Sequence, residues 1–133
     1  LDLRGQHLTT IPQCITQKPL LYTLQSLELS YNGFIELPPA LGELVNLQEL
    51  YLQHNSIELL PDELGNLVNL KRLGLAHNKL NDVPLYFGKF RQLEWLNISG
   101  NAIEVVPVFL LRIPRLKYLY LLCNPIENIP RDV

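Results

Sequence analysis

A sequence repeat with an interval of 23 positions runs through this chain and constrains its fold more than any other feature. The interval is marked by a recurring Asn, found at Asn32, Asn55, Asn78, Asn101 and Asn124. A Pro follows each Asn six positions later, at Pro38, Pro61, Pro84, Pro107 and Pro130. Such self-similarity predicts a stack of units in which each unit buries the apolar face of its neighbour.

The segment LQELYLQHNSI (residues 47–57) shows what one unit can build. Its alternation predicts a short strand in which Leu50 and Leu52 point into the core. The chain then turns at Asn55, whose amide needs partners because an unpaired buried polar group costs about 1–3 kcal/mol. We therefore expect a ladder of Asn side chains, each bonded to backbone groups of its own turn and of the neighbouring turn.

The return path of each unit reads LPxxLGxL, as in residues 37–44 and 60–67, and its leucines are expected to point back inward. A turn that ends a short helical segment is expected at the glycine of three units, Gly42, Gly65 and Gly88. The fifth unit has Leu111 at this place and Pro114 after it, so a different return path is expected there.

A further unit, LDLRGQHLTTIP (residues 1–12), precedes the five regular ones. Gln6 takes the place of the Asn and Pro12 that of the Pro, but the next such Pro, Pro38, comes three positions later than the repeat interval requires. Three residues are therefore inserted near TQKPLLYT, which we interpret as a longer convex loop marked by Pro19.

The fixed positions L-x-x-L-x-L-x-x-N-x-L resemble the leucine-rich repeat superfamily along the whole chain. This resemblance implies an α/β solenoid shaped as a curved horseshoe fragment, with a parallel β-sheet on the concave side and short or 3-10 helices and loops on the convex side. The 23-residue LPxxLGxLxxL unit is similar to intracellular Ras-suppressor, Scribble-type and plant Ras-group repeats, and to repeats of some bacterial effectors. In that class the repeats are protein-binding scaffolds. We divide the chain into one domain of six units: 1–23, 24–46, 47–69, 70–92, 93–115 and 116–133.

Cysteine usage and the chain ends suggest the setting of the domain. The chain contains no Met, and neither end shows a polar cap, so we expect a fragment of a longer protein. Two cysteines, Cys14 and Cys123, stand near opposite ends of the sequence, which favours a reducing, intracellular and cytoplasmic location. Extracellular relatives usually carry cysteine-rich caps, which supports the same location. The sequon Asn97-Ile98-Ser99 points the other way but is short enough to occur by chance.

Alternation along the strands predicts which side chains face the open concave side. Because Leu96 and Ile98 point inward, Trp95 and Asn97 should point outward. Two lines of side chains then run across the sheet, and the face they form begins acidic, at Asp2, Glu28 and Glu49, and ends aromatic, at Trp95, Tyr118 and Tyr120. Gly74 should leave a hollow edged by Arg72 and Trp95. Trp, Tyr and Arg beside a depression are typical of a binding hot spot, although cross-strand aromatic pairs can also simply stabilise a sheet. The predicted partner-binding residues are Glu28, Glu49, Tyr51, Arg72, Gly74, Trp95, Asn97, Tyr118 and Tyr120.

Charge is divided unevenly along the chain. Residues 1–69 carry a balance of −6 and residues 70–133 a balance of +4. The second half includes a basic ridge, which we define as Lys89, Arg91, Arg112, Arg115 and Lys117. Aromatic residues are not interleaved with this ridge as in a single-strand binder, so we interpret it as a solvated face and expect neither nucleic acid nor membrane as partner. The bipolar charge would permit head-to-tail self-association, which no motif indicates.

No residue pattern indicates catalysis. His54 and His77 occupy the same place in adjacent units and should lie within about 5 Å of each other. Cys123 shares their column two strands beyond His77, so the three form a line and not the converging set that zinc needs. No phosphate-binding glycine loop, nucleophile elbow or paired carboxylate in a pocket is present, and we expect no cofactor, no metal and no enzyme activity.

The sequence thus predicts a protein–protein interaction scaffold that binds a protein or peptide on its concave face, in intracellular signalling. One alternative is a substrate-recognition or autoinhibitory segment of a larger enzyme, such as a ligase, kinase or phosphatase. Another is a fragment of an extracellular receptor ectodomain.

Overall fold

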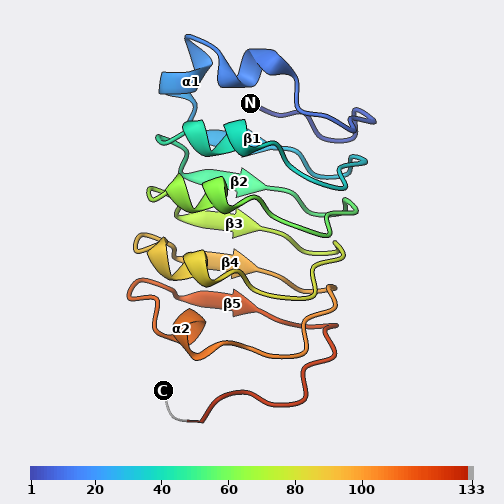
Figure 1. The fold of residues 1–133 in the computed structure, drawn as a ribbon, viewed down its shortest axis with the longest axis vertical. Coiled ribbons are helices and arrows are strands. Elements are labelled where there is room, and N and C mark those ends of the chain that lie inside the picture. The colour runs from blue at the N-terminus through green and yellow to red at the C-terminus, as the bar shows by residue number, and fades with distance from the viewer. Residues whose placement is uncertain (132–133) are drawn as a thin grey trace.

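The computed structural model describes residues 1–131 as a stack of similar turns that follow one another in chain order (Figure 1). Five strands alternate with the return segments: β1 (Ser26–Glu28), β2 (Glu49–Tyr51), β3 (Arg72–Gly74), β4 (Trp95–Asn97) and β5 (Tyr118–Tyr120). The helical segments are η1 (Gln13–Thr16), α1 (Leu20–Thr23), η2 (Pro39–Glu43), η3 (Asp62–Asn66), η4 (Leu85–Lys89) and α2 (Val108–Leu111).

The five strands form one parallel sheet in the order β1-β2-β3-β4-β5. Partner residues in neighbouring strands are one repeat interval apart, as in Leu50 opposite Leu73. The first unit extends the sheet by an isolated bridge between Asp2 and Glu28. The interval in the sequence is therefore the register of the sheet, and the predicted parallel solenoid is confirmed.

The core lies between the sheet and the return segments. Leu27, Leu50, Leu73 and Leu96, the middle residues of four strands, are all fully buried. They meet the inward residues of the return path, and in the fourth unit these are Phe87 and Phe90 in place of leucines. One continuous cluster results, so each unit depends on its neighbours for a dry interior.

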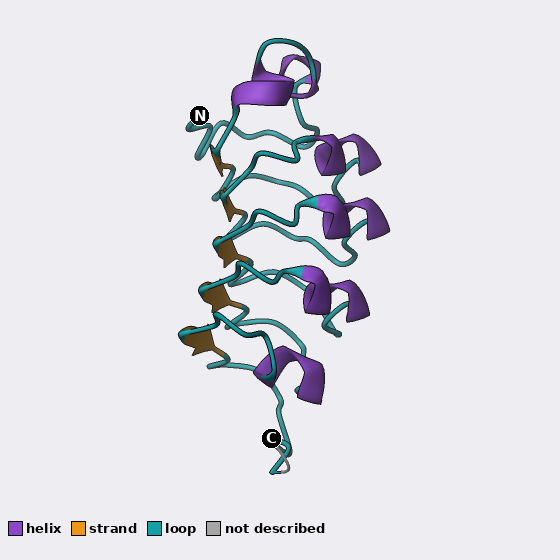
Figure 2. Cartoon of the chain, turned by 90° about the vertical axis from the view of Figure 1, so that its left-hand side faces the viewer, coloured by secondary structure: helices purple, strands orange, loops and turns teal. Residues whose placement is uncertain are grey.

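The return segments are one-turn helices that lie opposite the sheet (Figure 2). Three of them are 3-10 helices that begin one residue after the repeated Pro, which has an extended conformation or one close to it. The glycines of LPxxLGxL lie inside these helices, so the prediction that they form the terminating turn is wrong. Gly42 is needed for a different reason, because a Cβ atom there would collide with the backbone carbonyl of Glu63 in the next helix.

Two segments depart from the regular unit. The insertion near TQKPLLYT is not simply a loop, because its residues 20–23 form the one-turn helix α1. In the fifth unit, where Leu111 replaces the glycine, the return segment is the α-helix α2 in place of a 3-10 helix. The expected difference in that return path is thus confirmed.

The Asn ladder is present in every regular unit. In the fourth unit, Oδ1 of Asn78 accepts the N–H of Ile57 at 3.0 Å. Its Nδ2 donates to the carbonyl of Leu52 at 2.9 Å and to that of Leu75 at 3.1 Å. One buried side chain therefore joins two successive turns, as the sequence predicted.

The residue before each ladder Asn has a left-handed backbone conformation. The φ angle is positive at Tyr31, His54, His77, Gly100 and Cys123, between 54° and 66°. Only glycine adopts this conformation without steric cost, which is about 1–2 kcal/mol for other residues. The tight turn that buries the Asn therefore carries backbone strain in four of the five regular units.

Candidate protein-binding surface

The concave face is formed by the outward residues of the five strands. In β4, Leu96 is fully buried while Trp95 and Asn97 on either side of it are half-buried. The register places Trp95 between Arg72 and Tyr118, and Asn97 between Gly74 and Tyr120. The nine predicted partner-binding residues therefore all lie on the outward positions of one sheet, and their role in binding stays a prediction.

The acidic part of this face lies on β1 and β2. Glu28 and Tyr51 are directly opposite each other, and Glu49 is on the same face of β2. Oε1 of Glu28 accepts the N–H of Ser30 at 2.8 Å, and Oε2 of Glu49 accepts the hydroxyl of Ser26 at 3.1 Å. Burial raises the pKa of the Tyr51 phenol, and the charges of Glu49 and Glu28 add to this effect while Arg72 opposes it. Two carboxylates and a phenol thus share one small area.

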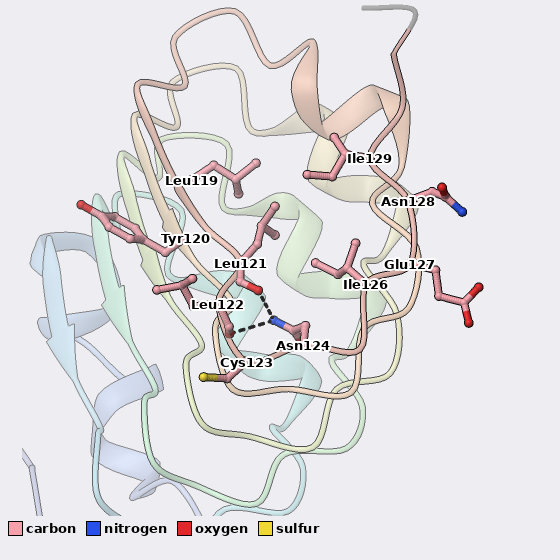
Figure 3. A pocket seen from close by; sticks show the side chains of 10 residues that line it. All are labelled: Leu119, Tyr120, Leu121, Leu122, Cys123, Asn124, Ile126, Glu127, Asn128 and Ile129. Atoms are coloured by element: carbon pink, nitrogen blue, oxygen red, sulfur yellow. Dashed lines mark hydrogen bonds between the residues drawn. The ribbon is translucent and has the colours of Figure 1, made fainter.

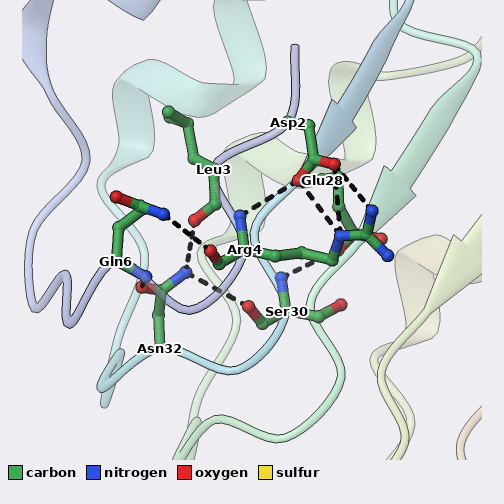
Figure 4. Close-up of polar contacts among 7 residues, drawn as sticks. All are labelled: Asp2, Leu3, Arg4, Gln6, Glu28, Ser30 and Asn32. Carbon is green, nitrogen blue, oxygen red and sulfur yellow. Dashed lines mark hydrogen bonds and ion pairs between the residues drawn. The ribbon is translucent and has the colours of Figure 1, made fainter.

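The first unit supplies a basic residue that sequence reasoning missed. Nη2 of Arg4 lies 2.7 Å from Oδ2 of Asp2, and this ion pair holds the pKa of Asp2 below its usual value (Figure 4). Asn32 ties the same turn to β1, since its Oδ1 accepts the N–H groups of Gln6 and Leu8. Asp2 is consequently neutralised, and the acidic character of the face depends on Glu28 and Glu49.

The aromatic residues form a connected group drawn from three strands. The ring centroids of Tyr51 and Trp95 are 6.2 Å apart with an edge-to-face angle of 66°. Those of Trp95 and Tyr120 are 5.8 Å apart. Neighbouring strands are about 4.8 Å apart, so Tyr51 on β2 and Trp95 on β4 meet by leaning over β3.

The hollow predicted at Gly74 is not open. A Cβ atom there would lie 2.5–2.6 Å from the amide group of Gln53, whose side chain already covers the glycine. Gly74 itself is buried. Sequence reasoning considered only two outward lines of residues, whereas Gln53 belongs to a third line just beyond the strand.

An open depression lies instead beside Trp95. It has a volume of about 290 Å³ and is lined by Arg72, Glu94, Trp95, Tyr118 and Tyr120. Tyr118 is 56% exposed and Tyr120 is 41% exposed, so both rings are accessible there. Nε of Arg72 is 3.9 Å from Oε1 of Glu49, and the Tyr51 phenol beside the guanidinium raises the pKa of Arg72.

Glu94 is a second residue that sequence reasoning missed. Nζ of Lys117 lies 3.1 Å from its carboxylate and holds the pKa of Glu94 below its usual value. Glu94 directly precedes β4 and its outward residue Trp95. It occupies the first variable position of the motif L-x-x-L. A reading of both variable positions, and not of the alternating ones alone, would have found it.

A column of stacked rings borders the concave face. The centroids of Tyr31 and His54 are 4.4 Å apart at an interplanar angle of 10°, and those of His54 and His77 are 4.4 Å apart at 14°. The predicted proximity of the two histidines is confirmed. The ring of His77 covers Gly100, where a Cβ atom would lie 2.6 Å from Nδ1. Among residues 1–131, no group of three or more His, Cys, Asp and Glu side chains could hold a metal ion.

A further pocket lies where β5 forms the edge of the sheet (Figure 3). Leu119, Leu121 and Ile126 are only half-buried there, whereas the equivalent residues of the inner units are fully buried. Nδ2 of Asn124 donates to the carbonyl of Leu121 at 3.0 Å and closes the turn beside the pocket. This pocket is therefore the apolar flank of the last described unit, and Tyr120 lies between it and the concave face.

The basic ridge is exposed along its length. Arg115 donates to Gln92 at 2.6 Å, and Lys117 donates to Glu94. No helix within the described part of the chain is both long and apolar enough to cross a membrane.

Structures similar to this one come from bacteria and plants. A leucine-rich repeat protein of Leptospira interrogans has a TM-score of 0.86 and 32% identity over 93% of this chain and 31% of that protein. An internalin of Listeria monocytogenes has a TM-score of 0.77 and 28% identity over 90% of this chain and 33% of that protein. The repeat ectodomain of the plant membrane receptor kinase GASSHO1/SCHENGEN3 from Arabidopsis thaliana, in complex with CASPARIAN STRIP INTEGRITY FACTOR 2, has a TM-score of 0.76 and 35% identity over 90% of this chain and 14% of that protein.

The chain thus spans a third or less of each of these proteins. No curated protein matches it in sequence. The sequence profile described as leucine rich repeat matches residues 22–80, 45–103 and 69–126, and these overlapping matches cover the units whose register and Asn ladder are described above. The chain therefore belongs to the leucine-rich repeat family.

Proposed function

We propose that this chain is a protein–protein interaction scaffold that binds a protein or peptide partner on its concave face. Members of this family generally mediate such interactions. The observation that carries the proposal is the contact of Trp95 with Tyr51 and Tyr120 beside an open depression. Trp and Tyr at the centre of a surface supply large contact area at low conformational cost, which is why they dominate binding hot spots.

The proposed setting is intracellular signalling. Both cysteines are exposed and free, a state that a reducing compartment maintains. The 23-residue unit with its LPxxLGxL return path also resembles the intracellular Ras-suppressor, Scribble-type and plant Ras-group repeats. The partner-binding residues of the proposal are those predicted from the sequence, except that Gly74 is covered by Gln53 and forms no hollow.

The test compares the parent chain with Trp95→Ala and Tyr120→Ala combined. The variant should lose partners that the parent captures from cell extract, and the affinity for each purified partner should fall by about 2 kcal/mol or more. Tyr22→Ala is the matched control, because Tyr22 is 57% exposed on α1, away from the sheet. Equal affinities of parent and double variant for every captured partner would refute binding at this site.

A receptor ectodomain is a second candidate, favoured by the sequon at Asn97 and by similarity to the plant receptor ectodomain. Asn97 lies in β4 next to Trp95, with its Oδ1 accepting the N–H of Ser99 at 3.0 Å. A glycan on Asn97 would cover the proposed site. Mass analysis of the protein isolated from its own cells decides between the settings, since a glycan on Asn97 there would exclude the intracellular proposal and this binding surface together.

A further inference from the structure

The concave face carries two separate areas of different chemistry. We define the acidic subsite as Glu28, Glu49 and Tyr51, on β1 and β2, and the aromatic subsite as Trp95, Tyr118 and Tyr120, on β4 and β5. Arg72 on β3 lies between them. A partner that crosses the strands must match both areas at once.

The acidic subsite fits a cation. Ser30 donates its N–H to Oε1 of Glu28. Within residues 1–131, the other carboxylate oxygen, Oε2, makes no hydrogen bond and can accept one from a partner. The nearby Arg4 is held by Asp2, and Glu49 has only a long contact with Arg72. Two neighbouring carboxylates with spare acceptor capacity favour an ammonium or guanidinium group, although Arg72 already engages the phenol of Tyr51 beside them.

The aromatic subsite fits an aromatic side chain and not a second cation. Rings alone would attract a cation, but Arg72 lines the depression and Lys117 borders it through Glu94. Glu94 is the one carboxylate among the described residues that line the depression, and it is already paired with Lys117. Repulsion by these two bases leaves a ring, which packs on Trp95 and Tyr118 and under the guanidinium of Arg72, as the best occupant.

The distance between the two subsites determines how far apart the cationic group and the aromatic ring must lie in the partner. The boundary between β1 and β2 is three strand intervals from the boundary between β4 and β5, or about 14 Å. An extended peptide advances about 3.3–3.6 Å per residue, so this distance corresponds to about four residues. An even spacing also places both side chains on the same side of an extended peptide.

We propose that the partner segment is an extended peptide with a basic residue and an aromatic residue separated by about four positions, the basic one on Glu28 and Glu49 and the aromatic one on Trp95. This inference rests on the proposed function, because it names the chemistry of the partner for the same surface. It also orients the peptide across the sheet, with its basic residue toward β1 and its aromatic residue toward β5, which the aromatic subsite alone would not do.

The experiment selects binders from a displayed library of random peptides and measures their affinities as free synthetic peptides. Three variants are compared with the parent: the double variant Glu28→Gln, Glu49→Gln; the single variant Trp95→Ala; and the control Glu43→Gln in η2. Each is used once its melting temperature has been shown to equal that of the parent. Gln keeps the acceptors for Ser30 and Ser26, so the double variant changes charge and little else.

The selected peptides should carry a basic residue about four positions from an aromatic one, and shifting either residue by one position should weaken binding. Replacing the basic residue by Gln should cost about threefold or more in the parent at low salt and nothing in the Glu28/Glu49 variant. Trp95→Ala should cost about thirtyfold.

Two results separate the inference from the proposed function. Peptides that depend on Trp95 but lack the basic residue, or that bind the Glu28/Glu49 variant equally well, would overturn the inference and leave the concave site in place. Selected peptides that are indifferent to Trp95 would overturn both.

Discussion

The Asn ladder shows how one residue type can define a turn. Asn78 is 8% exposed, and its amide accepts from one backbone N–H group and donates to carbonyls of its own and the preceding unit. Parallel strands of three residues would otherwise end with unpaired backbone groups inside the molecule. The side chain supplies those partners at the point where the strand stops.

Replacing Asn78 by Ala should therefore destabilise the chain by about 3 kcal/mol, because it leaves the N–H of Ile57 buried without its partner. Asn46→Ala is the control, since Asn46 makes an exposed hydrogen bond to the carbonyl of Tyr22. Urea denaturation of both variants measures the difference. Similar midpoints for the two variants would show that the ladder bonds contribute no more than a surface bond.

The stacked histidines give the turn a dependence on pH. Burial lowers the pKa of His54 below its ordinary value of 6.5, and the charge of His77 lowers it further. Below pH 6.5 the unfolded chain then binds more protons at this residue than the folded chain does. The free energy of unfolding should accordingly be greatest above pH 6.5 and fall as the pH drops below it.

His54→Asn should reduce this loss, since Asn tolerates the left-handed conformation and does not titrate. The measurement is the urea midpoint of parent and variant on both sides of the ordinary histidine pKa, with His7→Asn as control because His7 also has a positive φ angle, of 55°, but lies outside the stack. A variant as sensitive to acid as the parent would assign the effect to other groups.

At the scale of the element, the return helices are limited by how closely they approach one another. Gly42→Ala should destabilise the chain by about 2 kcal/mol or more, because the new methyl group meets the Glu63 carbonyl. Gly88→Ala is the matched control, since the nearest atom to its added Cβ is Phe109 Cδ2 at 3.8 Å. Thermal unfolding of the pair checks this, and an equal loss of stability would refute close approach as the cause.

The sequence predicts the elements well where their position follows from the repeat interval. The strands, the inward leucines and the outward position of Trp95 all follow from alternation and the register of the repeat. The covering of Gly74 by Gln53 does not, because a long side chain can bend along the sheet to a neighbouring strand. The pairing of Glu94 with Lys117 is also a contact between units, which alternation within one unit cannot reveal.

At the scale of the whole molecule, stability should be graded from the centre outward. Leu73 in β3 has neighbours on both sides and is fully buried, whereas Leu119 in β5 is half-buried. Leu73→Ala should cost about 3 kcal/mol or more and Leu119→Ala about half as much. Hydrogen exchange should follow the same gradient, fastest around β5. Uniform protection across the five strands would contradict a solenoid whose units are stabilised mainly by their neighbours.

The charge asymmetry of the sequence becomes spatial because units stack in chain order. That much was predictable from the repeat alone. The charges left unpaired at the surface could not be predicted in this way, since Arg4 neutralises Asp2 and Lys117 pairs with Glu94. The exposed charges that remain for a partner therefore differ from those counted in the sequence.

From Phe34 onward, the ladder bonds join a backbone N–H to an Asn at one constant separation along the chain, as from Phe34 to Asn55 and from Ile57 to Asn78. Removing or duplicating one whole internal unit would recreate every such bond with a different Asn, whereas a gain of any other length has to be accommodated in a return segment, as the three residues inserted near α1 are. Genetic change by whole repeat units can thus lengthen or shorten the molecule without disturbing the ladder. Each unit gained or lost between β2 and β4 would move the acidic and aromatic subsites apart or together by about 4.8 Å, so recombination could retune what the surface binds without altering either subsite.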